Sequence, residues 1–127
     1  LYFDFHNSNV IMYSGVAISA FSLALFVSSK ISLGNNYSPC YDQRVPNKIV
    51  TSGIYKLVRH PIYLSNILLI VGVFIISGSL LIIGNFILLT AFYILSAFRE
   101  ERYLINKFPR YKNYSKKTGM FVPRYWK

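Results

Sequence analysis

The chain has 127 residues, of which 54% are hydrophobic and 17% aromatic, and its formal net charge is +10. That length suits one domain, and the composition is too apolar for an ordinary soluble domain. Residues 5–29 and 62–98 contain no Lys, Arg, Asp or Glu. This segregation of charge disfavours a small soluble bundle, because too little polar sequence remains to cover three buried helices, and it favours an integral membrane protein.

The two charge-free stretches predict three membrane-spanning helices. A span needs about 20 apolar residues at about 1.5 Å each. Residues 10–29 therefore form one span, whereas residues 62–98 divide at the sequence SGS, residues 77–79, into spans 62–77 and 80–98. The predicted fold is an all-α, polytopic membrane helical bundle. We expect the small residues Gly72, Gly78 and Gly84 to let the second and third spans approach closely.

The basic residues predict the orientation of the spans. Every Lys and Arg lies in residues 30–59 or 99–127. The positive-inside rule places both segments, including the C-terminal tail, in the cytoplasm, and the N-terminus and residues 77–79 outside. A recognition helix or basic–aromatic repeat for nucleic acid is missing from the sequence. We therefore expect the lipid bilayer as a partner and no nucleic acid, and the sequence gives no oligomeric state.

The sequence offers little for metal binding. Cys40 is the only cysteine, and His6 and His60 lie far apart without paired acidic neighbours, so we expect no metal site. The first residues, LYFDFHN, begin with Leu and lack the basic region of a signal peptide. We expect them to be the exposed end of an earlier span that is missing from this sequence.

The connections between the spans carry turn and helix signals. Gly, Asn, Ser and Pro in residues 30–53 indicate a loop, followed by a turn at TSGIYKLV. Pro61 suits the first position of the second helix, where its missing N–H costs nothing. The apolar spacing in FREERYLINKF predicts that the third helix continues past residue 98 and stops before Pro109.

Two charged clusters border the apolar stretch. Arg59 and His60 precede the second span, and Arg99, Glu100 and Glu101 follow the third. An antiparallel hairpin of the two spans would bring both clusters to the same membrane face. A carboxylate pair there would stabilise a cationic ligand, or hold an arginine aimed at an anionic one. Salt bridges between helix ends, each worth about 0–1 kcal/mol, are the alternative, and the charge pattern by itself favours them slightly.

The sequence blocks at these clusters resemble a known family. The order GIYKLVRHPIY, apolar hairpin, EERYL, FPRYKNY and a late VP is similar to the isoprenylcysteine carboxyl methyltransferase family. That family belongs to a wider set of integral-membrane methyltransferases that includes phospholipid N-methyltransferases. The resemblance covers residues 51–126. It departs from the family at Pro109, where the family usually has glycine, so the resemblance does not determine the path of the chain into Tyr111 and Tyr114.

The resemblance implies a single membrane methyltransferase domain, residues 1–127, with its catalytic part in residues 51–126. It would transfer a methyl group from S-adenosylmethionine to a lipid or prenylated acceptor, most like isoprenylcysteine carboxyl O-methylation. The cofactor pocket would face the cytoplasm and be closed by the C-terminal tail. The implied cofactor-binding residues are His60, Tyr63, Glu100, Tyr55, Leu64, Tyr111 and Tyr114.

The resemblance also implies catalytic roles. Arg99 or Arg59 would orient an anionic acceptor, and Glu101 would take the proton from an amine acceptor. Three alternatives stay open at this point: a phospholipid N-methyltransferase, a nicotinamide-dependent membrane reductase relative, and a non-catalytic membrane protein.

Overall fold

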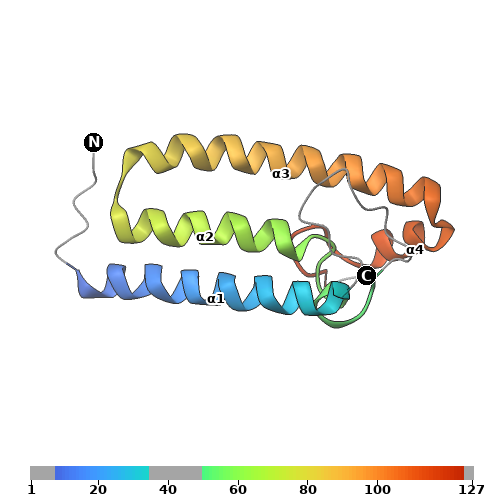
Figure 1. Cartoon of the computed structure of the whole chain (residues 1–127), viewed down its shortest axis with the longest axis horizontal. Coiled ribbons are helices and arrows are strands. Elements are labelled where there is room, and N and C mark those ends of the chain that lie inside the picture. The colour runs from blue at the N-terminus through green and yellow to red at the C-terminus, as the bar shows by residue number, and fades with distance from the viewer. Residues whose placement is uncertain (1–7, 35–49, 125–127) are drawn as a thin grey trace.

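The computed structural model describes residues 8–34 and 50–124, and this part of the chain is all-helical. Its elements are α1 (Asn9–Leu33), the 3-10 helix η2 (Gly53–Lys56), α2 (Pro61–Ser77), α3 (Leu80–Lys107) and α4 (Pro109–Lys117). The three long helices lie side by side and alternate in direction, with α2 between α1 and α3 (Figure 1). His6 and Cys40 lie outside the described residues.

The predicted helices are confirmed, with longer ends on two of them. Predicted span 10–29 lies within α1, span 62–77 matches α2, and span 80–98 forms the first part of α3. With 25 and 28 residues, α1 and α3 are long and apolar enough to cross a membrane. Helix α2 has 17 residues and is about 26 Å long at about 1.5 Å per residue, slightly less than the roughly 30 Å of a hydrocarbon core. The described residues therefore contain two candidate spans and one shorter apolar helix.

The helix ends follow from local chemistry. Gly78 adopts the left-handed conformation, with φ 63°, and its N–H donates to the Phe74 carbonyl over 2.8 Å, which closes α2. Pro61 occupies the first turn of α2 as predicted. Helix α3 stops at Phe108 because Pro109 follows, and Pro109 then starts α4. The departure from the family pattern at this proline is thus a sharp corner between two helices.

Helices α1 and α2 touch backbone to backbone. A Cβ atom built on Gly72 would lie 2.9 Å from the Gly15 carbonyl oxygen and 3.0 Å from the Ser19 nitrogen. A Cβ atom on Gly15 would lie 3.0 Å from the Gly72 carbonyl oxygen. The hydroxyls of the buried Ser22 and Ser29 donate to carbonyls of their own helix, so they fit this contact without an unpaired donor.

The expected role of the glycines between the second and third spans is therefore wrong for two of them. Gly72 faces α1, and Gly84 has no neighbour within 4 Å of a built Cβ atom. Helix α3 packs less extensively on α2 than α1 does. Its outer face is exposed at Leu81, Leu88 and Leu95, which recur every seven residues and form an apolar stripe suited to lipid.

Candidate functional site

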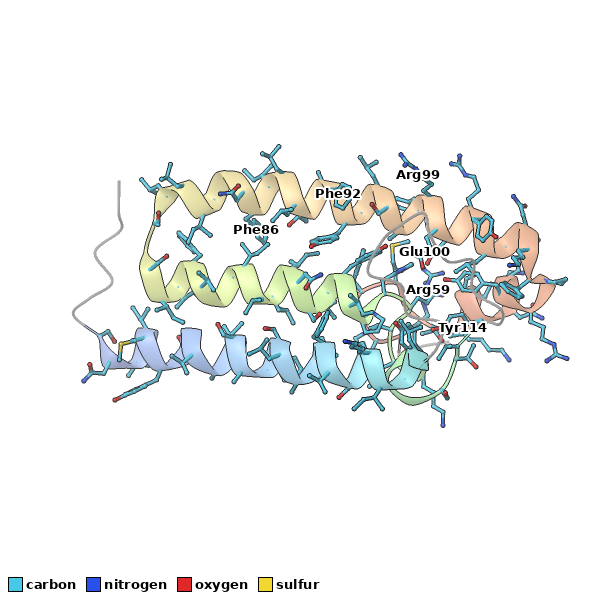
Figure 2. The ribbon with its side chains drawn as sticks, in the orientation of Figure 1. Arg59, Phe86, Phe92, Arg99, Glu100 and Tyr114 are labelled. Atoms are coloured by element: carbon cyan, nitrogen blue, oxygen red, sulfur yellow. The ribbon has the colours of Figure 1, made fainter. Side chains whose placement is uncertain are left out.

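The two charged clusters meet at one end of the helices. The Tyr63 hydroxyl at the start of α2 donates to Glu100 Oε2 of α3 over 3.0 Å. His60 Nε2 lies 2.9 Å from Glu101 Oε1. Figure 2 shows Glu100 and Arg59 pointing toward each other in the space between α3 and the start of α2. The expected adjacency of the two clusters is therefore confirmed.

The turn before α2 sets the direction of the site residues. Gly53 has φ 62°, a conformation that favours glycine, and it starts the 3-10 turn that buries Tyr55. His60 is the N-cap residue of α2, and its ring stacks on Tyr63, one turn later, with 5.5 Å between centroids. The Leu64 N–H donates to the His60 carbonyl over 3.0 Å and closes the first turn of α2, so the cofactor-binding role of Leu64 stays a prediction.

Glu101 is the buried acid of the site, and the side chains of Arg59 and His60 surround it. Besides His60, Arg59 Nε lies 3.1 Å from Glu101 Oε1, at ion-pair distance, but its N–H is not aimed well enough for a hydrogen bond. A second Arg59 nitrogen donates to the Ser115 carbonyl of α4 over 3.1 Å. A carboxylate oxygen of Glu101 accepts a hydrogen bond from His60 in the tautomer that carries its proton on Nε2.

Glu100 occupies a more open and more aromatic position. It is half-buried and accepts the Tyr63 hydroxyl. The Tyr63 ring also stacks on Tyr93 of α3, with 5.2 Å between centroids. Three rings, those of His60, Tyr63 and Tyr93, thus follow one another across the contact of α2 and α3. A carboxylate beside stacked aromatic faces is a combination that binds cations.

Three tyrosines attach α4 to this site. The Tyr114 hydroxyl donates to the Tyr55 carbonyl over 2.6 Å, and the Tyr111 ring meets Tyr114 edge to face. Burial is the main cause that raises the pKa of all three phenols above the ordinary value, and the charge of Glu100 raises the pKa of Tyr55 further. The three side chains therefore stay neutral hydrogen-bond donors across the physiological range.

The structure also brings to the site residues that were not predicted as site residues from the sequence. Tyr93 lies inside an expected span, and the only sequence pattern that links it to the site is its position seven residues before Glu100, on the same helix face. The segment after α4 pairs with the chain before α2: Gly119 forms a parallel bridge with Val58, and its carbonyl accepts the Arg59 N–H over 2.9 Å. No local sequence pattern indicates this pairing, because it joins residues about 60 positions apart.

The structure brings most of the predicted site residues together. Those that meet at this end are Arg59, His60, Tyr63, Glu100, Glu101, Tyr55, Tyr111 and Tyr114. Arg99 does not join them, since its side chain lies on the outer side of α3, away from Glu100 (Figure 2). Within residues 8–34 and 50–124, no group of three or more His, Cys, Asp or Glu side chains could hold a metal ion.

Comparisons with known proteins identify a family and a relative that are similar to this chain. The sequence profile of a family described as phospholipid methyltransferase matches residues 10–111, well over half of the chain. The cobalt-zinc-cadmium resistance protein CzcN of Cupriavidus metallidurans is 38% identical over 82 residues, which is 64% of this chain. The aligned region covers 38% of the length of that relative.

Proposed function

The chain belongs to the phospholipid methyltransferase family, and from this premise we propose that it transfers a methyl group from S-adenosylmethionine to a membrane-borne acceptor. The observation that carries this proposal is the meeting of Tyr63 with Glu100 and of His60 with Glu101 at the polar end of apolar helices. Membrane methyl transfer needs such a junction, because the donor is a polar cation and the acceptor is a lipid.

The residues present fit the proposed methyl donor. S-adenosylmethionine supplies an electrophilic methyl group on a sulfonium cation and carries a charged amino-acid end. Glu100 would hold a cationic group of the donor beside the aromatic rings at this end, where a cation–π contact is worth about 0.5–2 kcal/mol. The neutral phenols of Tyr111 and Tyr114 would line the pocket and exclude water, and catalysis would consist mainly of positioning.

The geometry favours an amine over a carboxylate as the acceptor. A carboxylate acceptor, as in isoprenylcysteine O-methylation, needs a cation to orient it. Arg59 is held by Glu101 and the Ser115 carbonyl, and Arg99 lies on the outer side of α3. Two carboxylates at the site suit a phospholipid amine headgroup better, and the half-buried Glu100 is the more accessible of the two to accept its proton. Isoprenylcysteine-type carboxyl O-methylation is the alternative.

We further propose the membrane topology that this reaction requires. Helix α2 would cross the bilayer as a third span together with α1 and α3, and the single domain would keep its site and its C-terminal tail in the cytoplasm. All described Lys and Arg residues lie at the end of the helices that carries the site, which supports this orientation.

Methyl transfer is tested with the purified protein in nanodiscs that contain phosphatidylethanolamine or a prenylated cysteine. The tritium label from methyl-labelled S-adenosylmethionine should appear in the amine lipid. Affinity for S-adenosylhomocysteine should fall at least tenfold in His60→Ala, Tyr63→Phe and Glu100→Gln. It should not fall in the control Arg102→Gln, which changes an exposed residue on α3, the helix of Glu100.

Two readouts on the same protein separate the alternatives. In the labelling assay, label in the prenylated cysteine would replace the amine proposal with carboxyl methylation. In the second assay, thermal unfolding, a ligand that binds the folded state raises the thermal midpoint. Stabilisation by reduced nicotinamide and not by S-adenosylhomocysteine would indicate a reductase, and stabilisation by neither would indicate a non-catalytic protein.

A further inference from the structure

The chain after α4 lies directly against the turn that carries His60. We call residues 118–121 the strap. Its Gly119 carbonyl accepts the Arg59 N–H over 2.9 Å, and its Met120 carbonyl accepts the His60 N–H over 3.1 Å. Phe121 then lies 6.0 Å from the His60 ring, between centroids. The strap therefore occupies the backbone donors of the two residues that surround Glu101.

The strap is itself folded so tightly that only glycine fits at its centre. A Cβ atom on Gly119 would overlap the Val122 carbonyl oxygen and would lie 3.0 Å from the Val122 carbonyl carbon. Both atoms belong to the backbone, so a side-chain rotation cannot relieve the overlap. Gly119 and its neighbour Thr118 are buried. Any larger residue at position 119 must push the strap and the Val122 backbone apart, and so alters the path of the chain beside Arg59 and His60.

We propose that the strap is a positioning element for the methyl-donor site, and that Gly119 is the residue on which its position depends. This inference rests on the proposed function for its ligand, whereas the strap contact itself is independent of it. The His60 ring has Tyr63 on one side and Phe121 near it from the strap, and its Nε2 reaches Glu101. The strap fixes the backbone from which that ring projects. Gly119 touches no reacting atom and acts through His60.

The closing experiment compares Gly119→Ala with Gly84→Ala, the same substitution at a helical glycine that has open space around it. Hydrogen exchange of the Arg59 and His60 amides, read from overlapping peptides in nanodiscs, should become at least tenfold faster in Gly119→Ala and stay unchanged in Gly84→Ala. Affinity for S-adenosylhomocysteine should fall at least tenfold in Gly119→Ala, in a protein that still unfolds cooperatively.

Each outcome decides the matter. Unchanged exchange of the two amides in Gly119→Ala would overturn the strap contact, and changed exchange with unchanged affinity would overturn its positioning role. If Gly119→Ala does not fold, Phe121→Ala decides: a threefold or greater loss of affinity in a folded protein supports positioning, and no loss overturns it. If the unaltered chain binds no S-adenosylhomocysteine, the proposed function and the positioning role fail together, while amide exchange still judges the strap contact.

Discussion

Helix α2 contacts its two neighbours in different ways. Against α1 the contact depends on missing side chains, because Gly72 and Gly15 bring the two backbones together. Against α3 it depends on particular side chains at one end, where Tyr63 and His60 reach Glu100 and Glu101. The first contact follows most of the length of both helices, and the second is much less extensive.

This difference separates the scaffold from the site. In lipid, where helices gain no hydrophobic stabilisation from one another, close packing of small residues is one way to hold two helices and polar contacts are another. The α1–α2 pair uses the first. The α2–α3 pair uses the second, so the groups that hold α3 in place are the same groups proposed to bind the methyl donor.

Glu101→Gln is expected to have the largest effect on stability. It removes the charge that faces Arg59 and His60, whose side chains are only 11% and 5% exposed. An uncompensated buried arginine costs about 3–5 kcal/mol, and the same polar contact holds α3 to α2. Thermal unfolding in detergent or nanodiscs measures the loss.

Glu100→Gln is the matched comparison to Glu101→Gln. Glu100 is half-buried and accepts a hydrogen bond from the Tyr63 hydroxyl. We expect it to cost less stability than Glu101→Gln and to lower donor affinity. Equal losses of stability would show that the two acids do not divide into a structural and a ligand-facing group.

Gly72→Ala tests the other contact of α2. The added Cβ meets the Gly15 carbonyl oxygen and the Ser19 backbone nitrogen, so α1 must move away, at a cost of about 1–3 kcal/mol. Gly84→Ala in α3 meets nothing and should be neutral or favourable by up to about 1 kcal/mol. A neutral Gly72→Ala would mean that the α1–α2 contact is looser than its geometry indicates. Thermal unfolding of both variants checks this.

The helices were predictable from sequence because charge and proline mark their limits. Residues 62–98 carry no charge, and the sequence SGS and Pro109 divide the chain where α2 and α3 end. Which neighbouring helix each face of α2 contacts was not predictable. A small residue such as Gly72 suits a contact with either neighbour, and only the three-dimensional arrangement shows that it faces α1 rather than α3.

The candidate site was predictable in its centre and not at its edges. An antiparallel hairpin necessarily returns Glu101 to the membrane face of His60, so their adjacency follows from topology. The side of α3 on which each residue lies depends on helix rotation, and for that reason Arg99 was expected in the site but lies outside it. The strap contact of Gly119 is a pairing of distant backbone groups and leaves no periodic pattern.

Tyr63→Phe sharpens the comparison by removing one donor and keeping the ring. The stacking on His60 and Tyr93 stays, while Glu100 loses the hydroxyl that is 3.0 Å away. We expect a loss of about 1–2 kcal/mol in stability, because the half-buried carboxylate keeps some access to water. Thermal unfolding measures it, and Tyr63→Ala should cost clearly more. A similar loss in both variants would assign the whole contribution to the hydroxyl.

The smallest effect at neutral pH concerns the tyrosines that attach α4 to the polar end. Folding raises the pKa of Tyr55, Tyr111 and Tyr114, mainly by burial, above the value of about 10 in the unfolded chain. Their contribution to stability is therefore complete below about pH 10. It declines at higher pH, because the unfolded chain releases these protons first, with a slope of at most about 1.4 kcal/mol per pH unit for each group. Thermal midpoints from pH 8 upward, with phenolate absorbance, measure this loss. Tyr114→Phe should lower the slope, whereas Gly72→Ala should leave it unchanged, since the α1–α2 contact contains none of these phenols. A decline that starts well below pH 9 would show that α4 is attached by other groups.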